Sequence, residues 1–64
     1  MLVGNIQKNG LLMIREYIDG EFIDFIGFID MQGVKKIDGN YIFFKNSITM
    51  LKLGKIIEET IEEL

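Results

Sequence analysis

Carboxylates and lysines are the side chains of this chain with the most scope for chemistry. Its 64 residues contain ten Asp and Glu, seven Lys and Arg, and neither His nor Cys. Without His or Cys, the chain cannot build a Ser–His or Cys–His nucleophile, a disulfide or a Cys-based zinc site. Asp24 and Asp30 could act as an acid–base pair or bind Mg²⁺ or Ca²⁺, but ten acids in so short a chain make such pairs unavoidable. We expect no catalytic residue, no metal site, no cofactor and no enzymatic activity.

Four of the ten acids lie together at the C-terminal end: Glu58, Glu59, Glu62 and Glu63. In a helix they would face the negative end of the macrodipole and form like-charge pairs four residues apart. One interpretation is a solvated end whose charge keeps an apolar protein soluble. The other is an acidic surface that binds a basic partner protein, because violations of local rules often mark function.

A second candidate surface combines basic and aromatic side chains. Single-strand nucleic-acid binders join a positive groove to stacking rings, and here Tyr17, Tyr41, Phe43 and Phe44 alternate with basic residues. The opposing interpretation is that these rings belong to the core and that scattered bases on a chain of net charge −3 form a weak footprint. The candidate nucleic-acid-binding residues are Arg15, Lys35, Lys36 and Lys45.

Three dipeptides predict the turns that position these residues. Asn9-Gly10, Asp19-Gly20 and Asp38-Gly39 favour two-residue hairpin turns, because both central residues tolerate positive φ, and Gln32-Gly33 is a weaker fourth signal. The runs between them are rich in Ile, Phe and Tyr and have the length of strands. We predict an antiparallel meander of four to five strands within residues 2–45, with strands at 2–8, 11–18, 21–30, 34–37 and 40–45.

Two of these turns lie in a repeat. IDGEFIDF (residues 18–25) returns nineteen positions later as IDGNYIFF (residues 37–44). Two hairpins whose turns converged on the same residues would produce this pattern, and so would an internal duplication. Under either origin, both segments are predicted to be hairpin returns.

A helix is predicted over residues 49–63. Ser47 or Thr49 can cap it, and apolar residues then recur at spacings of three and four, as in an amphipathic helix: Met50, Leu53, Ile57, Ile61 and Leu64. We expect this helix to pack on the sheet, with a partner-binding helix as the alternative. The predicted fold is therefore α+β, in a single domain of residues 1–64.

The strand at residues 21–30 is apolar on both faces. With simple alternation, Phe22, Ile26 and Phe28 point to one side and Phe25 to the other. One helix covers only one face, and so small a chain needs an additional source of stability. We expect a homodimer or larger assembly, whose interface contains Phe22, Phe25, Ile26 and Phe28. A sheet curled into a small barrel is the alternative.

The compartment expected from the sequence is the cytoplasm. No run of about eighteen apolar residues predicts a membrane span, and the N-terminus lacks the order of a signal peptide.

Two segments resemble the positive cofactor four family of single-stranded-DNA-binding transcriptional coactivators. They are IREY (residues 14–17) and KNSITML (residues 45–51), which leads into the expected helix. Strands followed by one C-terminal helix are also typical of that family. The resemblance covers residues 11–64 and implies a small dimer that binds a DNA strand across its sheets, with Arg15 in contact with the DNA.

Weighing these features, we expect a non-enzymatic, homo-oligomeric binding module. Its first expected role is that of a regulator or inhibitor acting through protein–protein contact, and single-stranded nucleic-acid binding is the alternative.

Overall fold

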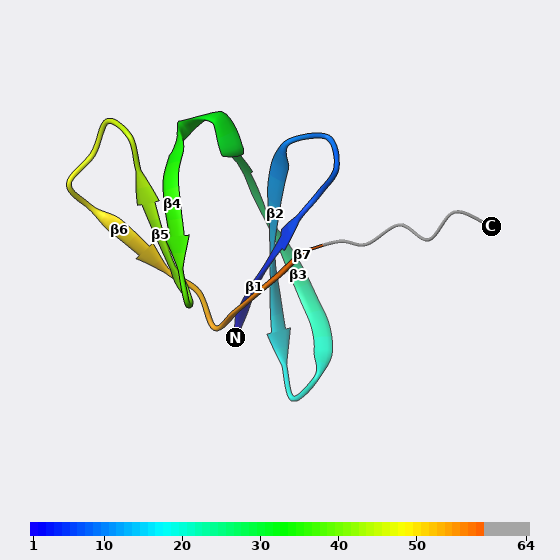
Figure 1. The fold of residues 1–64 in the computed structure, drawn as a ribbon. Coiled ribbons are helices and arrows are strands. Elements are labelled where there is room, and N and C mark those ends of the chain that lie inside the picture. Colours follow the sequence, from blue (N-terminus) through cyan, green and yellow to red (C-terminus); the bar gives the residue numbers. More distant parts are fainter. Residues whose placement is uncertain (59–64) are drawn as a thin grey trace.

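The computed structural model describes residues 1–58, and these form two sheets (Figure 1). Sheet A has the strand order β3-β2-β1-β7, and sheet B has the order β4-β5-β6. A short 3-10 helix, η1, joins the two sheets after β3. The element bounds are β1 (Leu2–Ile6), β2 (Leu11–Ile18), β3 (Glu21–Asp30), η1 (Met31–Gly33), β4 (Val34–Asp38), β5 (Tyr41–Phe44), β6 (Met50–Lys52) and β7 (Lys55–Glu58).

Each sheet contains an antiparallel meander. β1 pairs with β2 and β2 with β3, and β4 pairs with β5 and β5 with β6, always antiparallel. The five predicted strands are confirmed with ends within two residues, because hairpin turns and period-two alternation are local signals. The prediction that they form one meander was wrong, since β3 and β4 lie in different sheets. β7 is the exception, since it runs parallel to β1.

The two copies of the repeat are both hairpins, but their turns differ. In the first hairpin Ile18 pairs with Glu21, which leaves Asp19 (φ 52°) and Gly20 (φ 81°) as the central pair. In the second, Asp38 is the last residue of β4 and pairs with Tyr41, so the central residues are Gly39 (φ 60°) and Asn40. Only the first turn has positive φ at both positions, as type I′ requires, whereas the second has it at the first position, as in type II′. The prediction of Asp38 as a central turn residue was wrong.

The predicted C-terminal helix is contradicted. Residues 50–52 form β6 and residues 55–58 form β7, so the described fold is all-β rather than α+β. No helix within residues 1–58 has the length and apolar character to cross a bilayer. Two residues of the predicted apolar stripe differ in burial, since Met50 is exposed and Leu53 is buried. The segment is held by strand pairing, of β6 with β5 and of β7 with β1. Gly54 would have stood inside the helix, where it is unfavourable. Residues 59–63 of the predicted helix lie outside the described residues.

The core lies between the two sheets, so sheet B takes the place of the expected helix. Its buried members come from both sheets and from the segment between β6 and β7: Leu12, Ile14, Val34, Ile42 and Leu53. Gly4 makes room for two core side chains, because a Cβ at this position would lie 2.7 Å from Leu53 Cδ1 and 3.2 Å from Leu12 Cδ2. One face of sheet A is thereby covered, and its other face is not packed against sheet B.

Candidate interaction surface

Two irregularities in the pairing of β3 with β2 shape the uncovered side of sheet A. One extra β3 residue, Ile26, lies between the partners of Ile14 and Arg15. A second extra residue, Ile23, lies between the partners of Glu16 and Tyr17. Such bulges add a residue to one strand and reset which side chains share a face. Simple alternation along β3 therefore fails at two points.

The consequence is that Phe22, Phe25 and Phe28 share one face. They pair with alternate residues of β2, namely Tyr17, Arg15 and Met13. Phe25 and Phe28 are in edge contact, with ring centroids 5.1 Å apart, and Phe22 lies 5.9 Å from the Tyr17 ring. The prediction that Phe25 points away from the other two phenylalanines was wrong, because it assumed an unbroken ladder.

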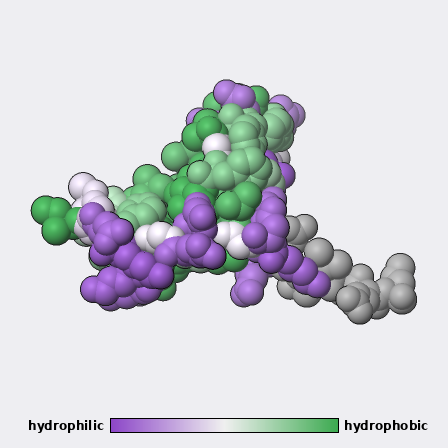
Figure 2. All heavy atoms as spheres, turned by 90° about the horizontal axis from the view of Figure 1, so that it is seen from above, coloured by the Kyte–Doolittle hydropathy of each residue, from purple (hydrophilic) through white to green (hydrophobic). Residues whose placement is uncertain are grey.

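We call the exposed apolar side chains of β3 the β3 surface: Phe22, Ile23, Phe25, Ile26 and Phe28. Each of them is 44–54% exposed, and within residues 1–58 β3 has a neighbouring strand on one side only. All four residues predicted to form an oligomer interface lie here. The hydrophobic side chains form a continuous area at the molecular surface (Figure 2). A long apolar edge strand is a template for pairing with another chain, and a large exposed apolar patch marks an interaction site.

Sheet B presents a different surface, in which lysines lie over aromatic rings. The register places Lys36, Phe43 and Met50 in one row across the strands. Asp38, Tyr41 and Lys52 form the next row. Lys36 Nζ lies 4.9 Å from the centre of the Phe43 ring, and Lys52 Nζ lies 5.6 Å from that of Tyr41. We call this side the cationic face.

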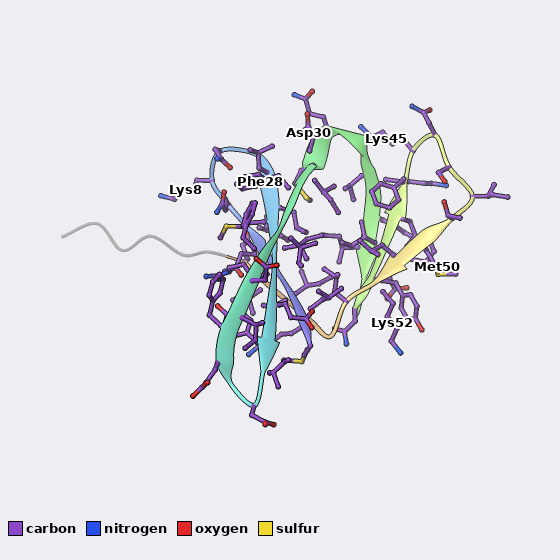
Figure 3. The ribbon with its side chains drawn as sticks, turned by 180° about the vertical axis from the view of Figure 1, so that it is seen from behind. Lys8, Phe28, Asp30, Lys45, Met50 and Lys52 are labelled. Atoms are coloured by element: carbon purple, nitrogen blue, oxygen red, sulfur yellow. The ribbon has the colours of Figure 1, made fainter. Side chains whose placement is uncertain are left out.

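The predicted nucleic-acid-binding residues are split between the sheets. Lys35 and Lys36 lie on β4 and Lys45 directly after β5, whereas Arg15 lies on β2 in sheet A. In Figure 3, Lys45 and Lys52 lie in the part of the molecule formed by sheet B, and Phe28 lies in the part formed by sheet A. Sequence reasoning missed Lys52, because it had been placed in the helix.

Arg15 has a local structural role. Its Nη2 donates to Asn5 Oδ1 at 2.8 Å, and its guanidinium carbon lies 5.5 Å from the centre of the Tyr17 ring. Its Nε is buried without a hydrogen-bond partner among the described residues. Beside it is a cavity of about 280 Å³, whose lining includes Met1, Val3, Lys55 and Ile57. The guanidinium is thus held against its own sheet.

The predicted acidic end is only partly described. Glu58 is an exposed residue of β7 and pairs with Ile6 of β1, so the helix-dipole argument does not apply to it. Glu59, Glu62 and Glu63 lie outside the described residues.

The two carboxylates considered for catalysis or metal binding both accept hydrogen bonds from nearby backbone N–H groups. Asp24 Oδ1 accepts from the Phe25 N–H at 2.8 Å, and Asp30 Oδ1 accepts from the Gln32 N–H at 2.9 Å, which caps η1. Residues 1–58 contain no cluster of three or more acids arranged to hold a metal ion.

Charge is segregated between the two halves of the fold. The β2–β3 hairpin, residues 11–30, carries one basic and five acidic side chains, a net charge of −4. Residues 31–52, which include all of sheet B, carry four lysines and one aspartate, a net charge of +3. The β3 surface is therefore apolar with an acidic rim, and the opposite sheet is basic.

The resemblance to the positive cofactor four family rested in part on a helix after the strands. Residues 50–58 form strands, so the described part of the chain does not contain this feature. No protein-family model matches the chain, and neither a curated protein nor a solved structure matches it.

Proposed function

We propose that this protein is a non-enzymatic, homo-oligomeric binding module that acts by protein–protein contact, as a regulator or inhibitor does. The observation that carries this proposal is the β3 surface, where five large apolar side chains on a ten-residue edge strand are about half exposed. No other strand of the described chain combines this length with this exposure. The contact site is therefore β3.

The small core also favours association. Six hydrophobic residues are buried within the described chain: Val3, Leu12, Ile14, Val34, Ile42 and Leu53. A chain of about 60 residues buries only about 60% of its unfolded surface, and domains of this size usually need a further source of stability such as oligomerisation. Covering β3 would add apolar burial that the monomer lacks.

The free energy available from apolar burial indicates how a partner covers β3. Full burial of a Phe or Ile side chain contributes about 1.5–3 kcal/mol, so covering the exposed half of five such residues contributes roughly 5 kcal/mol. Association costs about 4–15 kcal/mol in lost freedom. Apolar contact alone therefore gives weak binding, and the free backbone groups of the edge must contribute. Strand addition, in which another strand pairs with the edge, supplies those hydrogen bonds.

Light scattering after size exclusion tests this proposal. At micromolar concentration the protein should have a mass of at least twice its 7.4 kDa. Phe25→Ser should shift the mass toward the monomer, because Phe25 is exposed and its loss removes apolar area without opening the core. Ile48→Ser is the matched control, since Ile48 is fully exposed in the segment between β5 and β6. A monomeric native protein would contradict the proposal.

Single-stranded nucleic-acid binding is the second candidate, favoured by the lysine and aromatic pairs of the cationic face. Its test is fluorescence anisotropy with a labelled single-stranded oligonucleotide across a range of salt concentrations, because phosphate contacts give a steep salt dependence. We expect no binding at physiological salt, since the chain has a net charge of −3 and Lys36 and Lys52 already lie over the two rings. Tight, salt-sensitive binding that Lys36→Glu abolishes would reverse the ranking.

A further inference from the structure

The charge around β3 identifies the kind of partner that fits it. The charged residues of β3 are Glu21, Asp24 and Asp30, and the strand contains no basic residue. A strand that pairs with β3 and carries basic side chains would gain from this charge, whereas an acidic strand would be repelled. The best partner is an apolar strand with lysines.

A second β3 strand fits poorly. If two copies of β3 paired antiparallel over their full length, Glu21 would lie opposite Asp30 of the other strand. Any other register also fails to bring a base opposite an acid, because β3 has only acids. Like charges directly opposite each other destabilise a sheet, so a symmetric β3–β3 dimer would leave the acids uncompensated.

β4 has the properties that β3 requires. It is an edge strand of sheet B, with the sequence VKKID. Lys35 and Lys36 are exposed on it, and the surrounding residues 31–52 carry a net charge of +3. Within one molecule β3 and β4 are consecutive but belong to different sheets. Among the edge strands of residues 1–58, β3 is thus acidic and apolar, and β4 carries two adjacent exposed lysines.

We propose that the β3 edge of one copy pairs with the β4 edge of a second copy, head to tail. This inference rests on the proposed function and names its partner as the same chain. Glu21 and Asp24 of one copy then lie near Lys35 and Lys36 of the next, and the β3 surface packs beside sheet B. Two copies that exchange both contacts, β3 with β4 and β4 with β3, form a closed two-fold pair, whereas copies joined by one contact each keep a free edge at both ends and form rings or open filaments. The assembly is therefore a dimer with two such contacts or a larger species.

Charge reversal tests this pairing. The first variant, Lys35→Glu with Lys36→Glu, has two acidic edges, and the second, Glu21→Lys with Asp24→Lys, has two basic edges. All four residues are exposed, and the only side-chain hydrogen bond given up within residues 1–58 is that of Asp24 Oδ1 with the adjacent Phe25 N–H, so both variants should keep the circular dichroism of the native fold. Each variant alone should require on the order of 100-fold more protein to assemble, because like charges at an interface cost several kcal/mol. An equimolar mixture should recover the mass of the native assembly.

Three other outcomes overturn the inference. If the Lys35→Glu, Lys36→Glu variant alone keeps the native mass, then β4 is not in the interface, although the proposed function survives. If replacing Glu58, Glu59, Glu62 and Glu63 by Gln abolishes assembly, the acidic partner is the C-terminal end instead of β3. If nuclease treatment of the native protein removes the larger species, nucleic acid holds the copies together. A native protein that is monomeric before any substitution would instead refute the proposed function itself.

Discussion

Asparagine at the two repeat turns should have different effects, even though both turns read Asp-Gly in the sequence. Gly20 has φ 81° at the second central position of its turn, and Gly39 has φ 60° at the first position of its own. A Cβ added at either position would have no atom within 4 Å. Any loss of stability on substitution therefore comes from backbone strain and not from a steric clash with neighbouring groups.

The magnitudes follow from the two turn types. At Gly20 the type I′ turn needs a left-handed conformation, which Asn adopts readily, so Gly20→Asn should cost about 0.5 kcal/mol. At Gly39 the type II′ turn places its first central residue in a region that is almost restricted to glycine, and Gly39→Asn should cost about 1–3 kcal/mol. Gly20→Val and Gly39→Val should each cost about 1 kcal/mol or more, because a β-branched residue resists positive φ.

Urea denaturation of the four variants at one fixed protein concentration measures these differences, since oligomerisation makes the midpoint depend on concentration. The midpoint should fall little for Gly20→Asn and clearly for Gly39→Asn, with an unchanged slope. Equal losses for the two Asn variants would refute the reasoning, because they would mean that the two turns have the same type. An unchanged midpoint in either Val variant would show that the corresponding turn is misassigned.

Three further perturbations have effects that the structure predicts. Gly4→Ala should lower the free energy of unfolding by about 1–3 kcal/mol, as chemical denaturation would show, because its Cβ would lie 2.7 Å from Leu53 Cδ1 in the core; no loss would mean that the Leu53 side chain moves aside without cost. Asp30→Ala should cost about 1 kcal/mol in the same assay by removing the cap of η1, and Asp30→Asn, which keeps the acceptor oxygen, should recover most of it. Raising the salt concentration should reduce the mass measured by light scattering, because screening weakens the attraction between the acidic and basic edges; a mass that rises with salt would indicate an interface without charge pairing.

Local signals in the sequence were enough to locate the first five strands. Asp19-Gly20 mark a turn because few residues tolerate positive φ, and the strand at residues 21–30 was predicted with both of its ends correct. The two-sided apolar character of that strand also follows from its composition, and with it the prediction that Phe22, Phe25, Ile26 and Phe28 remain available for contact. Turns and the apolar composition of a strand depend on residues that are adjacent in the sequence, so both can be predicted from the sequence alone.

The tertiary structure alone decided the rest. The apolar residues from Met50 to Ile57 fit both a helix and short strands, because the periodicity of so short a segment does not distinguish the two. Pairing with β5 and with β1, distant in the chain, selected the strands. The bulges at Ile23 and Ile26 depend on how β3 meets β2, so alternation could not place Phe25 on the face of Phe22 and Phe28. The strand pairing also separated Arg15 in sheet A from the lysines of sheet B, and it put the acidic edge and the basic edge on different sheets. Which sheet a residue joins depends on contacts between segments distant in the chain, and no short stretch of sequence contains that information.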